Sequence, residues 1–157
     1  MKYTSIDNTL FIENRKKFAK ELAPNSIAIF FSNDEMPRSA DQSFPFRQNP
    51  DLFWLSGIDQ EQTILIIFPD CPNKVYTEAL FIRKTNEHIA VWEGHKYTID
   101  EARKASGIQN IFWADSFESV LPSLLSYCDN VYVNINENDR ANNYVPYKDI
   151  RFANEIK

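Results

Sequence analysis

TILIIF, residues 63–68, is an apolar run without the polar alternation of a strand that faces water on one side. Such a run is typical of a strand that is covered on both faces. Turn residues follow it, and the apolar run ALFI at residues 79–82 then predicts a partner strand in a hairpin. Residues 26–32, SIAIFFS, have the same character. The sequence therefore predicts a β-sheet that is buried on both faces.

Helices are predicted before and after these strands. Residues 6–23 carry apolar side chains at helical offsets among charged ones, and a proline closes the segment. We interpret the basic residues in its middle, which include Arg15, as its solvated side. A second helix is predicted over residues 98–107, because Thr98 and Glu101 have the spacing of a capping box and a glycine ends the segment.

The last third of the chain continues the alternation of strands and helices. Residues 108–112 are interpreted as a strand, and residues 116–127 as a helix that contains Pro122. Residues 131–135 alternate as a strand does, and residues 147–156 are interpreted as a final helix. We found no internal repeat. The predicted fold class is α/β, with a mixed β-sheet flanked by helices.

Size and charge restrict the classes of protein that this chain can represent. Its 157 residues match the size of one compact domain. The net charge of −5 argues against a surface for nucleic acid, which requires a basic face. No apolar run approaches the roughly 18–20 residues that span a bilayer, and the N-terminus lacks the order of a signal peptide. We therefore expect a cytoplasmic protein that binds neither nucleic acid nor membrane.

The histidines and cysteines of the chain do not form a metal or redox motif. His88 and His95 are the two histidines, and their spacing matches no ligand motif, so we interpret both as surface residues. Cys71 and Cys128 are far apart in sequence and are interpreted as idle thiols. The sequence predicts no metal site in this chain.

The sequence also lacks the motifs of nucleophilic and acid–base sites. The chain contains no nucleophile-elbow motif and no glycine-rich phosphate loop, and Ser56 with Gly57 is interpreted as a turn. Asp59 and Glu61 are interpreted as a hydrophilic turn between strands, because paired carboxylates in acid–base catalysis need contrasting environments. We conclude that the sequence contains no complete active site.

One stretch, RSADQSFPFRQNPDLFWLSG at residues 38–57, has no helical or alternating period. Its charged side chains must be paired or hydrogen-bonded if they are buried, because an isolated buried charge is destabilising. The two prolines in the stretch hold the preceding residues in extended conformation. We interpret the stretch as a rigid loop that completes the core. Its structural residues are predicted to be Arg38, Arg47, Asn49 and Asp51.

The same stretch carries a resemblance to a known family. Residues 38–70, together with ALFI at 79–82, VWEG at 91–94 and EARKASGI at 101–108, resemble the N-terminal domain of aminopeptidase P. These are the Xaa-Pro aminopeptidases of the creatinase/prolidase superfamily, and the resemblance extends over about residues 11–133. It implies a ribonuclease-H-like topology for residues 1–140. It further implies that residues 141–157 are a connector helix toward a catalytic domain that this chain lacks.

The resemblance also implies an activity for the parent protein. In this family a pita-bread catalytic domain holds two Mn²⁺ ions, and a metal-bridging hydroxide cleaves the bond between the first residue and a following proline. This chain would bind no cofactor and would be inactive alone. Its implied partners are its own catalytic domain, further copies of itself in a dimer or tetramer, and peptides with proline second.

Two residues match positions that reach the active-site region in the family, commonly that of a neighbouring subunit. The resemblance implies that Trp92 walls the substrate pocket and that Asp41 pairs with an arginine of the catalytic domain. The alternatives are that Trp92 is a core tryptophan and that Asp41 forms a salt bridge with Arg38 or Arg47. A different function also stays open, namely a stand-alone binding or assembly module with the same fold and no peptidase activity.

Overall fold

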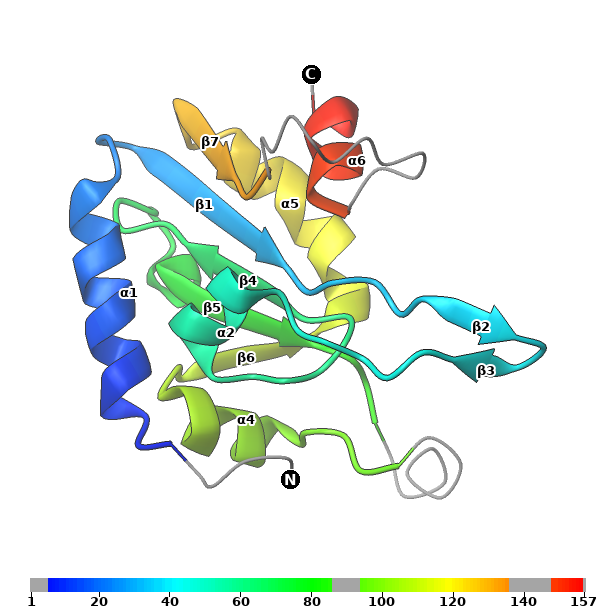
Figure 1. Ribbon diagram of the computed structural model, residues 1–157. Helices are drawn as coiled ribbons and strands as arrows, with labels where there is room; N and C mark the ends of the chain where they lie inside the picture. Colours follow the sequence, from blue (N-terminus) through cyan, green and yellow to red (C-terminus); the bar gives the residue numbers. More distant parts are fainter. Residues whose placement is uncertain (1–5, 86–93, 136–147, 157) are drawn as a thin grey trace.

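The computed structural model describes residues 6–85, 94–135 and 148–156. They form a five-stranded sheet with the order β6-β5-β4-β1-β7 (Figure 1). The pairs β1–β4 and β4–β5 are antiparallel, while β1–β7 and β5–β6 are parallel. The prediction of a mixed sheet and of a hairpin from residues 63–68 and 79–82 is therefore confirmed. The strands are β1 (Ser26–Phe31), β4 (Ile64–Ile67), β5 (Glu78–Ile82), β6 (Asn110–Trp113) and β7 (Asn130–Val133).

Helices cover both faces of this sheet (Figure 1). On one face, α5 and α6 contribute buried side chains to a core cluster. On the other face, α1, α2 and α4 pack against a second cluster. The helices are α1 (Thr9–Glu21), α2 (Pro50–Ser56), α4 (Ile99–Ser106), α5 (Phe117–Leu125) and α6 (Lys148–Glu155), with short 3-10 turns η1 (Lys74–Tyr76) and η2 (Ala114–Ser116).

The two covered faces explain why the strands lack polar alternation. In β1, Ile27, Ile29 and Phe31 belong to the cluster under α5 and α6. The intervening Ala28 and Phe30 belong to the opposite cluster. All six residues of β1 are buried, as are all four of β4. Both faces of these strands are therefore apolar, as the sequence predicts.

The helices predicted around the sheet are also confirmed. The side chain of Thr98 accepts the backbone N–H of Glu101, and the Glu101 carboxylate accepts the N–H of Thr98, so α4 begins with the predicted capping box. Gly107 ends this helix with a φ of 74°. Helix α6 packs on the sheet, with the ring of Phe152 centred 5.0 Å from that of Phe31. The predicted domain boundary at residue 140 stays a prediction.

Arg15 corrects one interpretation, because it is not on the solvated side of α1. Its side chain is 1% exposed. Its Nη1 donates to the carbonyls of Leu55 at 2.8 Å and Ser106 at 3.0 Å, and its Nε donates to Glu78 at 3.0 Å. The two carbonyls lie in the last turns of α2 and α4, where helix carbonyls lack intrahelical donors. Arg15 thus joins three helices and one strand in the interior.

Residues 38–57 correct a second interpretation, because they are not one continuous loop. They contain a hairpin, formed by β2 (Pro37–Ser39) and β3 (Gln42–Ser43), and then α2. The Asn49 side chain caps α2 by accepting the N–H groups of Asp51 and Leu52, and a proline occupies the first turn. Gly57 ends the helix with a φ of 70°, which favours glycine. A helix of seven residues is too short to reveal a period.

Candidate functional site

The β2–β3 hairpin projects beyond the end of β1, away from the sheet and its helices (Figure 1). We call residues 36–44 the arm. The backbone N–H of Phe44 donates to the carbonyl of Met36 at 2.9 Å and closes its base. Ala40 forms the turn with a φ of 50°. Every residue of the arm is exposed, so the arm contributes almost nothing to the core.

The side chains of the arm combine charged and aromatic groups. The guanidinium of Arg38 lies over the ring of Phe44, 5.9 Å from its centroid. Phe44 remains 54% exposed and Met36 59% exposed. Asp41 lies beside the turn, and among the described residues it forms no ion pair with Arg38 or Arg47. The carboxylate of Asp41 is therefore accessible to solvent and to a partner.

Polar contacts connect the base of the arm to the body of the domain. Asn33 Nδ2 donates to the carbonyl of Arg47 at 3.0 Å and links the two chain segments that enter and leave the arm. Next to it, both carboxylate oxygens of Asp34 accept from Nη2 of Arg151, at 3.1 and 3.3 Å. Arg151 belongs to α6, so this ion pair joins the segment just before the arm to that helix.

A cluster of charges lies beside the arm where β4 begins and β5 ends. Glu61 is only 4% exposed. Its Oε1 accepts from Arg83 Nη1 at 2.8 Å and from Lys96 Nζ at 2.5 Å. Arg83 Nη1 also lies 3.8 Å from Glu35, the residue before the arm. The interpretation of Glu61 as part of a hydrophilic turn is therefore wrong, because two cations compensate its buried charge.

The environment of Glu61 changes its acidity. Burial acts to raise the pKa of this carboxyl group, because it disfavours the charged form. The hydrogen bonds from Lys96 and Arg83 oppose that effect, and the pKa is lowered below its ordinary value of 4.5. Glu61 is therefore an anion at neutral pH. No local pattern around Glu61 indicates this role, since its partners are 22 and 35 residues away in the sequence.

Gln60, next to Glu61, forms hydrogen bonds with two other segments of the chain, one at Tyr97 and one at Gln48. Its Oε1 accepts the backbone N–H of Tyr97 at 2.7 Å. Its carbonyl accepts from Gln48 Nε2 at 2.8 Å. The segment before α4 is thus tied to the start of β4. In that segment, burial and the negative charges of Asp59 and Glu101 raise the pKa of the Tyr97 hydroxyl.

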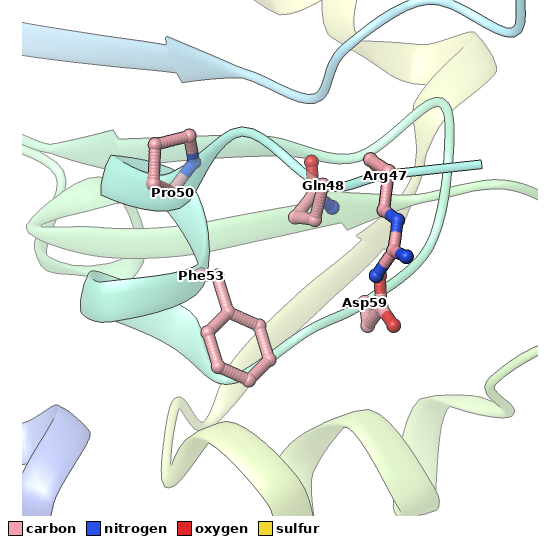
Figure 2. Close-up of a pocket in the computed structure, with 5 residues that line it drawn as sticks. All are labelled: Arg47, Gln48, Pro50, Phe53 and Asp59. Atoms are coloured by element: carbon pink, nitrogen blue, oxygen red, sulfur yellow. The ribbon is translucent and has the colours of Figure 1, made fainter. Parts of the chain in front are cut away.

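A small cavity of about 210 Å³ opens close to this cluster. Arg47, Gln48, Pro50, Phe53 and Asp59 line it. Figure 2 shows the guanidinium of Arg47 directed toward Asp59, with the Phe53 ring at the α2 side. The cavity therefore offers charged groups at one end and an aromatic surface at the other.

Asn49 and Asp51 lie on the other side of α2. Besides capping the helix, Asn49 Oδ1 lies 3.4 Å from Asn134 Nδ2. The same Nδ2 donates to Asp51 at 2.8 Å, and Asn134 directly follows β7. These two residues therefore connect the start of α2 to the end of the edge strand. The structure separates them from Arg38 and Asp41, which lie in the exposed arm.

Two residues considered in the sequence, Trp92 and His88, lie outside the described residues. His95 is exposed, and its Nε2 lies 3.1 Å from Glu101. Within residues 6–85, 94–135 and 148–156, no three His, Cys, Asp or Glu side chains come together as metal ligands would. In that part of the chain, no helix has the length and apolarity needed to cross a membrane.

Comparison with solved structures finds the same architecture in aminopeptidases P. A Bacillus anthracis structure assigned as an aminopeptidase P superposes with a TM-score of 0.83 and 25% identity, over 96% of this chain and 36% of that one. Aminopeptidase P of Escherichia coli superposes with a TM-score of 0.75 and 25% identity, over 88% and 31%. This similarity confirms the predicted fold class.

Sequence comparison gives the same family. The Xaa-Pro aminopeptidase of Haemophilus influenzae is 25% identical over 122 residues, which are 78% of this chain and 28% of the relative. That of Escherichia coli K12 is 26% identical over 129 residues, or 82% and 29%. The chain thus spans less than a third of the length of these relatives. Because residues 11–132 also match the family profile "Aminopeptidase P, N-terminal domain", the chain belongs to the family of aminopeptidase P N-terminal domains.

Proposed function

We propose that this chain is the non-catalytic N-terminal domain of a cytoplasmic, manganese-dependent Xaa-Pro aminopeptidase, which removes the N-terminal residue before a proline. In this proposal the domain restricts access to the active site and mediates contacts between subunits. The observation that carries the proposal is the arm, which projects from a domain of this family with all its side chains exposed. A hairpin that buries so little is retained for contacts outside the domain.

The proposed contact is made by both polar and apolar groups of the arm. Asp41 presents an accessible carboxylate to an arginine of the catalytic domain, its own or that of a neighbouring copy. Phe44 and Met36 add exposed apolar surface near it. Trp92 is proposed to form part of the wall of the substrate pocket. Together these residues would limit the site to free peptide N-termini.

The proposed chemistry belongs to the missing catalytic domain. The described residues of this chain offer no set of three potential metal ligands, so they do not fit the two Mn²⁺ ions of the family. The ions would be held by the catalytic domain, where they would activate the attacking hydroxide. This chain would supply shape and charge around the substrate and would be inactive alone.

Kinetics of the full polypeptide from its source test this role. We expect Asp41→Ala to lower kcat/KM for an Xaa-Pro peptide about tenfold, because the partner arginine loses its carboxylate. Trp92→Leu should also raise KM or lower kcat/KM. Asp100→Ala is the matched control, since Asp100 is 91% exposed on α4, outside the arm. The proposed contact is wrong if Asp41→Ala behaves like Asp100→Ala.

The mass of the native polypeptide separates the proposal from its main alternative. An antibody against this chain should detect a protein well over twice as heavy as 18.4 kDa, because the 122 and 129 matched residues make up only 28% and 29% of the two relatives. A native polypeptide of 18.4 kDa would contradict the proposal and would favour a stand-alone binding or assembly module.

A further inference from the structure

Two consecutive acidic residues precede the arm, and each pairs with an arginine from a different part of the fold. Asp34 receives both of its contacts from Arg151 on α6, at 3.1 and 3.3 Å. Glu35 lies 3.8 Å from Arg83, directly after β5. Beyond these residues the side chains of the arm are exposed. Among the residues that the structure describes, Asp34 and Glu35 are therefore the last charged side chains before the arm that pair with the body.

Both arginines are themselves held in place. Arg83 donates to Glu61, which is buried and also binds Lys96, so the partner of Glu35 belongs to a fixed cluster. Arg151 is carried by a helix whose Phe152 is 3% exposed and packs against Phe31 at the end of β1. The two arginines therefore have defined positions on two different parts of the body, one directly after β5 and one on α6.

A two-stranded hairpin of this size has little stability of its own and no core to fix its direction. Its backbone contacts hold the two strands together, but they leave the angle between arm and body free to vary. Ion pairs to two arginines restrict that angle, because Asp34 and Glu35 are adjacent and pair with two different elements of the body.

We propose that Asp34 and Glu35 are positioning residues that hold the arm in one direction through Arg151 and Arg83. The arm is thereby coupled to α6, the last described helix of the chain. What the arm contacts rests on the proposed function, whereas the direction of the arm is a property of this chain alone. The two can therefore be tested separately.

Distances between spin labels measure the direction of the arm in the 157-residue chain. One label is attached at Gln42→Cys on β3 and the other at Lys17→Cys on α1, both at exposed positions. The background carries Cys128→Ser, and Cys71 is fully buried. The parent chain should give one narrow distance distribution.

The variants change one carboxylate at a time. We expect Asp34→Asn and Glu35→Gln each to increase the population at other distances about two- to fivefold, the change expected for a partly exposed ion pair. The double variant should give the broadest distribution. Asp34→Glu keeps the charge and should retain most of the narrow distribution. Glu13→Gln removes a comparable exposed ion pair to Lys16, away from the arm, and should change nothing.

Equal widths for the parent, Asp34→Asn, Glu35→Gln and the double variant would overturn the proposal. So would an equal broadening by Glu13→Gln, since the effect would then not belong to the arm. Unfolding curves taken alongside show that each variant is folded, and these side chains are exposed enough to be replaced without loss of the core. Asp34→Asn and Glu35→Gln could broaden the distance distribution while Xaa-Pro hydrolysis by the full polypeptide is unchanged. That result would support Asp34 and Glu35 as positioning residues, and the proposed function of the arm would fail.

Discussion

The strand β1 and the arm lie only a few residues apart, yet they have opposite environments. Each of the six residues of β1 is buried between two layers of helices. Each residue of the arm, from 36 to 44, is exposed. Substitutions in the body should therefore change the stability of the domain, and substitutions in the arm should change its contacts. The difference in burial thus separates the residues that stabilise the fold from those that are available for contacts with other molecules or domains.

The largest expected effect comes from Arg15, a charge inside the body. Arg15→Ala removes the donor from two helix carbonyls and from Glu78. We expect the free energy of unfolding to fall by about 3–5 kcal/mol, as when one partner of a buried pair is lost. Denaturant unfolding measures this change. Lys16→Ala, which removes the neighbouring but 61% exposed side chain, should cost less than about 0.5 kcal/mol.

Should Arg15→Ala and Lys16→Ala prove equally stable, the buried Arg15 side chain would contribute no more to stability than the exposed side chain of Lys16. Burial of a side chain in the body would then not predict its contribution to stability, even at Arg15, where the largest effect is expected.

A smaller effect is expected from Glu61, which lies where the body meets the arm. Because its pKa is lower in the folded chain than its ordinary value of 4.5, Glu61 stabilises the fold above that pH. This contribution is lost as the pH falls through the lowered pKa. Glu61→Gln should therefore cost about 1–3 kcal/mol near pH 7. The difference from the parent should shrink steadily below pH 4.5.

Unfolding measured from pH 7 to pH 3 tests this assignment. A difference between the parent and Glu61→Gln that stays constant over the whole range would show that the charge of Glu61 does not stabilise the fold. Glu13→Gln serves as the control, because its carboxylate is exposed and pairs with an exposed lysine.

The smallest effect is expected in the arm itself. Phe44 is 54% exposed, so Phe44→Ala should change the free energy of unfolding by less than about 0.5 kcal/mol. Thermal or denaturant unfolding of the chain gives this value. A loss of about 3 kcal/mol or more, as found for buried Phe residues replaced by alanine, would show that Phe44 is packed like the residues of the body.

The elements of the body could be predicted because their signals are local. Apolar runs without alternation, as in β1 and β4, follow directly from burial on both faces. The capping box at Thr98 is complete within four residues. In both cases a short window of sequence contains the whole physical cause of the structure.

The site could be predicted only in part, because its causes are distant in sequence or too short to form a pattern. Helix α2 has a cap at Asn49 and an ending at Gly57, but its seven residues show no period. Glu61 looks like a surface residue until the chain brings Arg83 and Lys96 to it. Charged residues such as Glu61, Arg83 and Lys96 are equally compatible with exposed loops and with a buried ion-pair cluster. Only the folded structure shows that they form the cluster.

The position of β1 in the sheet has a consequence for the synthesis of the chain. β1 pairs with β4 on one side and with β7 on the other, and Ser26 contacts Asn130 across a separation of 104 residues. The N-terminal part of a nascent chain therefore leaves the ribosome with one edge of β1 still open. Until β7 follows, this apolar strand has unpaired backbone groups and is exposed to association with other chains. The sheet can thus be completed only after residue 133, the last residue of β7, has been translated.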